Sequence, residues 1–155
     1  ERWGHASPFI RAIEDGLIDP RAMISVGVKG PLNTETDLAF ARDRGVTLLT
    51  HSRWQERGDG ELREFIGRLG TRDVYVTVDI DVVDPAFAPG TGTPCPGGFT
   101  PAELLRLLRA LRGIRIAGAD VVEVLPDRDV GGVTALLAAH VMFEILALDA
   151  VTRRA

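Results

Sequence analysis

The sequence predicts an α/β protein built around a parallel β-sheet. Short runs rich in valine and isoleucine alternate along the chain with segments of helical periodicity, which is the pattern of repeated βαβ units. Two of these runs, Val74–Asp79 and Ile114–Val121, are apolar almost throughout, as expected for parallel strands covered on both faces. The 155 residues suffice for one domain with its own hydrophobic core.

Two further strands precede these, at Met23–Val28 and Val46–Thr50. Both are short and mostly apolar, which is typical of strands in α/β folds. The sequence therefore predicts four strands, and the segments between them are candidates for helices.

Signals of helix starts and ends fall between the strands. Pro8–Gly16 has Ser7 as a candidate N-cap and proline at its first position. Glu35–Arg44 and Glu61–Leu69 are each followed by a glycine, the residue that most often ends a helix.

The strongest start signal comes later, at Thr100, Pro101 and Glu103. This order predicts a capping box, with threonine as N-cap and glutamate three residues on. The leucines that follow form one apolar stripe, which we expect to face the sheet. A last helix is predicted from about Val133 to Ala150.

Composition excludes several classes of function. The net charge of −4 and the scattered basic residues argue against a nucleic-acid surface. The single cysteine, Cys95, excludes a disulfide framework and a cysteine zinc site, and it fits a reducing, cytoplasmic location. The apolar segment Ala135–Val151 is interrupted by His140, Glu144 and Asp149, so we interpret it as a buried helix and expect no membrane partner.

Two loops rich in proline and glycine follow predicted strands directly. They span residues 84–98 and 126–132. Ligands of open α/β sheets bind at the carboxyl ends of the strands, where such loops gather. A functional site is therefore expected at this end of the sheet.

Asp79 and Asp81 lie where one apolar run meets the first of these loops. Because strand side chains alternate between faces, Thr77, Asp79 and Asp81 are predicted to point to one face. Two ionised carboxylates there repel each other unless a cation neutralises them, and oxygen ligands suit Mg²⁺ or Mn²⁺. Asp-x-Asp is a short motif that also occurs in glycosyltransferases and phosphotransferases, so a metal site and ordinary strand-end polar residues both stay open here. Asp84, before Pro85, is interpreted as a turn former.

The longer context resembles the agmatinase branch of the ureohydrolases, the arginase/agmatinase family. The run Asp79–Pro94, with Gly97–Thr100 after it, is similar to that branch's signature, including its proline and glycine positions. His5–Phe9 is similar to the family's His-Gly-Thr-Pro-Phe, with alanine and serine in place of glycine and threonine. Asp120–Pro126 is similar to Asp-Val-Val-Glu-Val-x-Pro.

This resemblance implies a fold, a reaction and a set of residues. The fold is a three-layer α/β/α sandwich with a mainly parallel sheet. The reaction is manganese-dependent hydrolysis of a small guanidino compound, of the agmatine or guanidinobutyrate type, to urea and an amine. Asp79 and Asp81 take the positions of manganese ligands, with two Mn²⁺ per complete site. Glu123 takes that of the guanidinium-binding carboxylate, and His5 that of a proton shuttle beside the substrate. Asp79 would also pass a proton to the leaving amine, and homotrimers or hexamers are usual.

The family's Gly-Gly-Asp-His and Asp-Ala-His-x-Asp segments are not found, and the chain begins at Glu1 without methionine. We therefore expect residues 1–155 to be the C-terminal part of one ureohydrolase domain, through truncation. The alternatives are a second polypeptide that supplies the remainder, or a non-catalytic fragment or assembly module of the same fold. Related deacetylases are disfavoured by Glu123, and a sugar-nucleotide transferase leaves His5 and Glu123 unexplained.

Overall fold

Strands and helices alternate along the chain, as predicted. In the computed structural model, which describes residues 3–32, 34 and 36–154, every predicted strand is confirmed and each end differs by at most one residue. The strands are β1 (Ile24–Val28), β2 (Thr47–Thr50), β3 (Asp73–Asp79) and β4 (Arg115–Val122).

The helices include the five predicted from the sequence and a sixth. They are α1 (Pro8–Glu14), α2 (Ala39–Arg44), α3 (His51–Arg57), α4 (Gly60–Leu69), α5 (Pro101–Ala110) and α6 (Val133–Thr152). Three short 3₁₀ turns lie between them: η1 (Pro20–Ala22), η2 (Ile80–Val82) and η3 (Pro126–Arg128).

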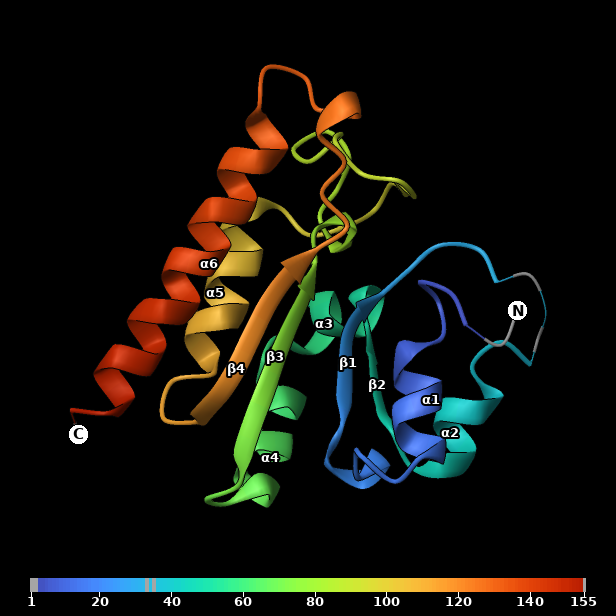
Figure 1. Cartoon of the computed structure of the whole chain (residues 1–155), viewed down its shortest axis with the longest axis vertical. Helices are drawn as coiled ribbons and strands as arrows, with labels where there is room; N and C mark the ends of the chain where they lie inside the picture. Colours follow the sequence, from blue (N-terminus) through green and yellow to red (C-terminus); the bar gives the residue numbers. More distant parts are fainter. Residues whose placement is uncertain (1–2, 33, 35, 155) are drawn as a thin grey trace.

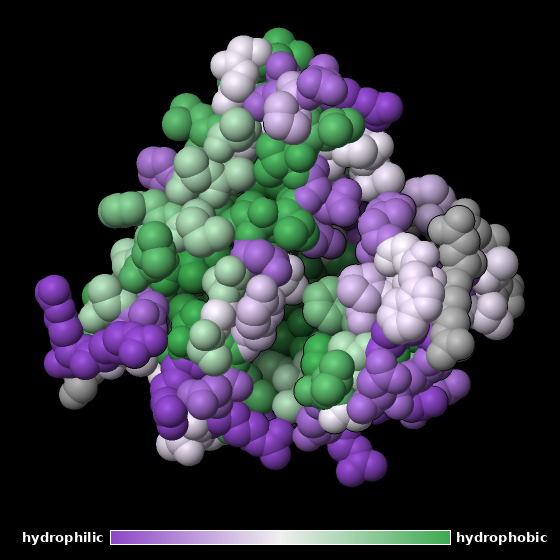
Figure 2. Space-filling view, viewed as in Figure 1, coloured by the Kyte–Doolittle hydropathy of each residue, from purple (hydrophilic) through white to green (hydrophobic). Residues whose placement is uncertain are grey.

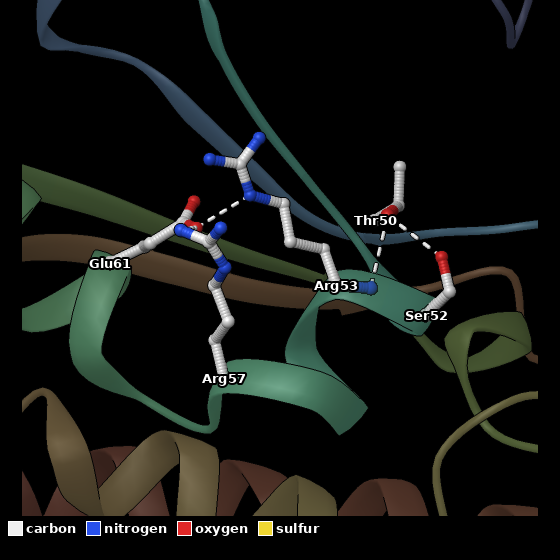
Figure 3. A network of polar contacts seen from close by, with 5 residues as sticks. All are labelled: Thr50, Ser52, Arg53, Arg57 and Glu61. Atoms are coloured by element: carbon white, nitrogen blue, oxygen red, sulfur yellow. Dashed lines mark hydrogen bonds and ion pairs between the residues drawn. The ribbon is translucent and has the colours of Figure 1, made fainter.

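Helix α3 is the element that the sequence pattern did not predict. It starts directly where β2 ends, and the Thr50 hydroxyl caps it by accepting the Arg53 amide at 3.3 Å. Its polar face is tied to α4 because Arg53 and Arg57 both contact the Glu61 carboxylate, at 2.5 and 3.5 Å (Figure 3). Trp54 is its one buried residue, so the helix lacks the repeated apolar positions that reveal an amphipathic helix in sequence.

One predicted helix start is wrong, and one predicted N-cap makes no capping bond. Helix α2 begins at Ala39, because the Asp37 carboxylate accepts the backbone amide of Thr34 and holds the preceding residues in a turn. Glu35, the predicted start, lies outside the described residues. Ser7 occupies the N-cap position of α1 but makes no capping bond, since its hydroxyl is bonded to the backbone of Gly4.

The start of α5 is the predicted capping box. Thr100 accepts the amide of Glu103, and the Glu103 carboxylate accepts the amide of Thr100 at 2.8 Å. We expect Thr100→Ala to lower the free energy of unfolding by about 1 kcal/mol, the usual cost of losing such a cap. Urea denaturation of both proteins measures this, with the exposed Thr71→Ala as the matched control. An equal effect of the two substitutions would contradict the cap's contribution.

The strands form two parallel pairs. β1 pairs with β2, and β3 pairs with β4. All four strands run in the same direction, and the edge of β3 faces the edge of β1 (Figure 1). Gly27 lies in β1 with φ +88°, and its missing side chain lets β1 approach the turn that follows β3. A Cβ at Gly27 would lie 2.4 Å from the Val82 side chain.

A cleft of about 1230 Å³ separates the two pairs. The facing edges of β1 and β3 form its sides, and apolar side chains of α4 and α5, among them Phe65 and Leu108, line it as well. Figure 2 shows the hollow between the two halves of the molecule. Asp79 and Asp81 lie along it, so the unpaired strand edges lead directly to the predicted site.

Two surfaces of the β3–β4 half are more open than predicted. Helices α5 and α6 pack together, and α6 packs against β4, whereas Tyr75 of β3 is 61% exposed. The prediction that these strands are covered on both faces is therefore wrong for the described chain. No described segment packs over the face that carries Tyr75.

Helix α6 is buried on one face only. Val141, Ile145 and Leu148 lie in the core, while Leu136 and Phe143 are exposed and contribute to the apolar surface over this helix (Figure 2). Within the described part of the chain, α6 is the one helix with the length and composition to cross a membrane. Its interpretation as a buried helix is corrected for the outer face, because apolar side chains such as Leu136 and Phe143 are exposed there.

Candidate active site

The predicted site residues gather at the carboxyl ends of β3 and β4. Asp79 is the last residue of β3, and its pairing partner across the sheet is Val122. Glu123 follows Val122 directly, so the parallel register brings it next to Asp79. Asp81 lies two residues beyond β3, in the turn η2.

The placement of Asp81 differs from the strand argument made for it. The strand ends at Asp79, and residues 80–82 form a 3₁₀ turn, so alternation of strand faces does not apply to Asp81. Asp81 nevertheless lies close enough to Asp79 to act on it electrostatically. Its carboxylate is held by the Thr93 hydroxyl, which donates to it at 2.7 Å.

The surroundings of Asp79 disfavour its ionised form. Desolvation of its carboxylate raises its pKa above the ordinary value, and the negative charges of Asp81, Glu123 and Asp120 raise it further. Asp79 lies along the open cleft and is exposed as a residue, although its carboxylate is desolvated enough to raise its pKa. A cation between Asp79 and Asp81 would relieve this repulsion.

The raised pKa of Asp79 predicts a pH-dependent stability in the metal-free chain. The folded protein keeps the Asp79 proton to higher pH than the unfolded chain does, so the group destabilises the fold once the pH passes its ordinary value of 3.8. We expect Asp79→Asn to raise the free energy of unfolding at pH 7, by less than about 1 kcal/mol because the residue is solvent-accessible. At pH 3 Asp79 is protonated in the folded and in most of the unfolded chains, so we expect Asp79→Asn to leave the free energy of unfolding nearly unchanged.

Urea denaturation in the presence of a chelator measures this difference at both pH values. The exposed Asp127→Asn is the control, since Asp127 has no side-chain hydrogen bond or ion pair among the described residues. A loss of stability in Asp79→Asn at pH 7 would contradict the electrostatic account.

Glu123 has an unusual backbone conformation. It is the one residue other than glycine in the described chain with positive φ, at +64°. Left-handed backbone is unfavourable for a residue with a side chain, and it persists only where the surroundings impose it. A Cβ at Gly92 would lie 3.9 Å from Glu123 Oε2, so the glycine-rich loop runs beside this carboxylate.

His5 lies beside Glu123. Its Nδ1 is 3.8 Å from Glu123 Oε1, and the His5 side chain is 74% exposed whereas that of Glu123 is 29% exposed. The histidine thus contacts both the carboxylate and the solvent. The structure therefore brings the N-terminal motif and the motif at the end of β4 together, although 117 residues lie between His5 and Glu123.

Asp84 organises the loop that covers the site. Its carboxylate accepts the amides of Ala86 at 2.9 Å and Gly97 at 2.8 Å, and these hydrogen bonds hold its pKa below the ordinary value. Asp84 is thus occupied as a turn former, as predicted. In the same loop, the backbone carbonyl of Cys95 accepts a hydrogen bond from the Lys29 ammonium at 2.7 Å.

Asp120 is a polar support below the site. It faces Thr77 across the two strands and accepts hydrogen bonds from the Thr77 hydroxyl at 2.5 Å and the Tyr75 hydroxyl at 2.8 Å. The bond to Asp120 raises the pKa of Tyr75. This network links β3 to β4 at Thr77, two residues before Asp79.

The donor set suits part of a metal centre. Asp79 and Asp81 offer hard carboxylate oxygens of the kind that bind Mn²⁺ or Mg²⁺, and their mutual repulsion favours a cation. No group of three or more histidine, cysteine, aspartate or glutamate side chains with metal-site geometry is present among residues 3–32, 34 and 36–154. Asp79 and Asp81 are therefore candidates for two ligands of such a centre, and no third ligand joins them among the described residues.

Comparison with known proteins identifies the family. The profile of the arginase family matches residues 1–148. The chain belongs to the arginase family. The resemblance seen in the motifs is thus confirmed over almost the whole sequence.

Relatives of this arginase-family chain include several guanidino hydrolases. It is 48% identical over 145 residues to guanidinopropionase of Pseudomonas aeruginosa, covering 93% of this chain and 46% of that protein. It is 38% identical over 154 residues to the human mitochondrial guanidino acid hydrolase, covering 98% of this chain and 44% of the relative.

Solved structures confirm the fold of this arginase-family chain. The proclavaminate amidino hydrolase of Streptomyces clavuligerus superposes with a TM-score of 0.90 at 44% identity, over 97% of this chain and 50% of that one. The arginase of Bacillus caldovelox does so with a TM-score of 0.72 at 30% identity, over 83% of this chain and 44% of that one. The chain thus spans about half the length of the relatives it matches.

Proposed function

We propose that this chain supplies the C-terminal half of a manganese-dependent guanidino hydrolase that releases urea and an amine. The observation that carries the proposal is the convergence of Asp79, Asp81 and Glu123 at the ends of two paired strands, with His5 in contact with Glu123. The names of the relatives support the class of substrate.

Each of these residues has a distinct role in the proposed reaction. Glu123 binds the planar guanidinium through paired charge-assisted hydrogen bonds and orients its carbon. His5, which faces both Glu123 and solvent, exchanges protons between the site and bulk water. Asp79, which the register of the paired strands places next to Glu123, passes a proton to the leaving amine.

Asp79 and Asp81 would hold manganese, with two ions in the complete site. When bound, manganese supplies Lewis acidity and lowers the pKa of a water molecule. The Thr93 hydroxyl fixes the orientation of the Asp81 carboxylate toward this position. The repulsion felt by Asp79 in the metal-free chain becomes attraction for the cation.

The remaining ligands come, in this proposal, from the sequence that the longer relatives have in addition. The cleft between β1 and β3 supports this, because two free strand edges that run in parallel face each other across it. A strand placed there would join both pairs into one sheet and end beside Asp79. From the resemblance alone we also propose a cytoplasmic homo-oligomer, a trimer or hexamer, that acts in polyamine metabolism.

A chimera tests the proposed function. In it, this chain replaces the matching part of the Pseudomonas guanidinopropionase, so that the relative supplies the remaining sequence. We expect Mn²⁺-dependent urea release from agmatine, 4-guanidinobutyrate or 3-guanidinopropionate, and the panel names the substrate. A folded chimera that binds two Mn²⁺ and hydrolyses none of these compounds, nor arginine, would refute the proposal.

The alternative of a non-catalytic assembly module is not favoured. Such a module would have no need of His5, Asp79, Asp81 and Glu123, yet all four are present and adjacent. The open apolar face of α6 is compatible with either function.

A further inference from the structure

A buried clamp holds the loop of residues 89–93 against the start of α6. The amide of Gly90 donates to the Thr134 hydroxyl at 2.8 Å, and Thr134 is fully buried. Gly90 also packs directly on Asp129, because a Cβ at Gly90 would lie 2.6 Å from the Asp129 Cβ. We call Gly90, Asp129 and Thr134 the Gly90 clamp.

Asp129 is itself rigidly held. Its two carboxylate oxygens accept the amides of Thr134 and Ala135, both at 2.9 Å. Gly132, the N-cap of α6, has no side chain to make these bonds. Asp129 therefore satisfies two of the free amides at the start of α6, and the helix fixes the surface on which Gly90 rests.

The other side of Gly90 is bonded to the segment after β4. The carbonyl oxygen of Gly90 accepts the Leu125 amide at 2.8 Å, and Thr91 forms an antiparallel bridge with Val124. This segment begins at Glu123, whose backbone is strained at φ +64°. Because contacts must hold such a conformation in place, the bonds through Gly90 hold Glu123 in its orientation.

We infer that Thr134 and Asp129 are positioning residues, which act through Gly90 to hold the Glu123 carboxylate where it meets the substrate guanidinium. This inference rests on the proposed function, since it assigns Glu123 to substrate binding. Thr134 is fully buried and the Asp129 carboxylate is bonded to the start of α6, so we assign neither residue a contact with the substrate. A change in Thr134 is expected to leave the metal ligands intact and to weaken the alignment of the substrate.

The first test measures the clamp without any activity. Thr134→Val keeps the shape of the side chain but removes the acceptor for Gly90. We expect amide hydrogen exchange at Leu125 in the 155-residue chain, followed by NMR, to accelerate at least tenfold. Thr134→Ser restores the acceptor and is expected to return the rate to within about twofold of the parent.

Thr152→Val is the matched control on the same helix. Among the described residues, the Thr152 hydroxyl donates to the Leu148 carbonyl, at 2.9 Å, and lies at the far end of α6 from Thr134. We expect it to leave exchange at Leu125 unchanged. Equal rates in Thr134→Val and the parent, or equal acceleration in Thr152→Val, would overturn the clamp.

The second test follows substrate use in the chimera. We expect Thr134→Val to lower kcat/KM about tenfold, mainly through KM, with the same Mn²⁺ content, and Thr134→Ser and Thr152→Val to keep the parental value. Unchanged kcat/KM in Thr134→Val, in a protein whose Leu125 exchange is accelerated, would overturn the positioning role. If the parental chimera folds and binds two Mn²⁺ but releases no urea, the proposed function and the positioning role both fail, while the exchange rates still decide whether the clamp exists.

Discussion

Replacing Asp79 or Asp81 by alanine is expected to abolish Mn²⁺-dependent urea release by the chimera. In the proposed function the two carboxylates are the ligands that this chain offers, and the negative charges around Asp79 favour a cation there. Loss of a group that merely supports a ligand costs roughly 10–100-fold in metal affinity or activity. Loss of a ligand is expected to exceed this, and the bound Mn²⁺ per chain should fall with the activity.

The measurement is urea release at saturating Mn²⁺, with metal counted in the same sample. Asp127→Ala removes an exposed carboxylate in η3 and is expected to leave both quantities unchanged, which controls for loss of general negative charge. Two Mn²⁺ per chain in both the Asp79 and Asp81 variants would show that the ligand assignment is wrong.

Replacing Glu123 by alanine is expected to raise KM and lower kcat while the Mn²⁺ content stays normal. A hydrogen bond to a charged group contributes about 1.5–3 kcal/mol, so loss of a paired interaction costs about 3–6 kcal/mol. Since each 1.4 kcal/mol is a factor of ten, kcat/KM should fall by roughly 10²–10⁴-fold. Steady-state kinetics with the best substrate of the panel measures this.

Glu123→Gln separates charge from shape in the same experiment. Glutamine keeps the size of the side chain but loses the charge, so we expect it to lose most of kcat/KM as alanine does. If Glu123→Ala instead releases manganese, Glu123 is a metal ligand and its role in guanidinium binding is wrong.

The strands and the region of the site were predictable because the signals that specify them are local. Apolar runs of five to eight residues marked β3 and β4, and the proline and glycine residues after Asp84 marked the loop that covers the site. Asp79 and Glu123 each lie at the end of such a run, and parallel pairing then brings them together.

Contacts between segments that are distant in the chain could not be predicted from local sequence patterns. The chain leaves the strand at Asp79 and turns through residues 80–82, so the strand-face argument for Asp81 was wrong although the neighbourhood was right. The positive φ of Glu123 and the bond from Gly90 to Thr134 depend on how three separate segments pack. Helix α3 was missed because a single buried tryptophan gives no periodicity.

The central claim is that this chain holds half of an active site. The most direct test is to titrate the 155-residue chain with Mn²⁺, count the tightly bound metal, and measure urea release from agmatine, 4-guanidinobutyrate and arginine in the same samples. We predict less than one tightly bound Mn²⁺ per chain and no urea, because Asp79 and Asp81 form no larger ligand group among the described residues. Two Mn²⁺ per chain together with urea release would contradict the claim and show that the chain is a complete enzyme by itself.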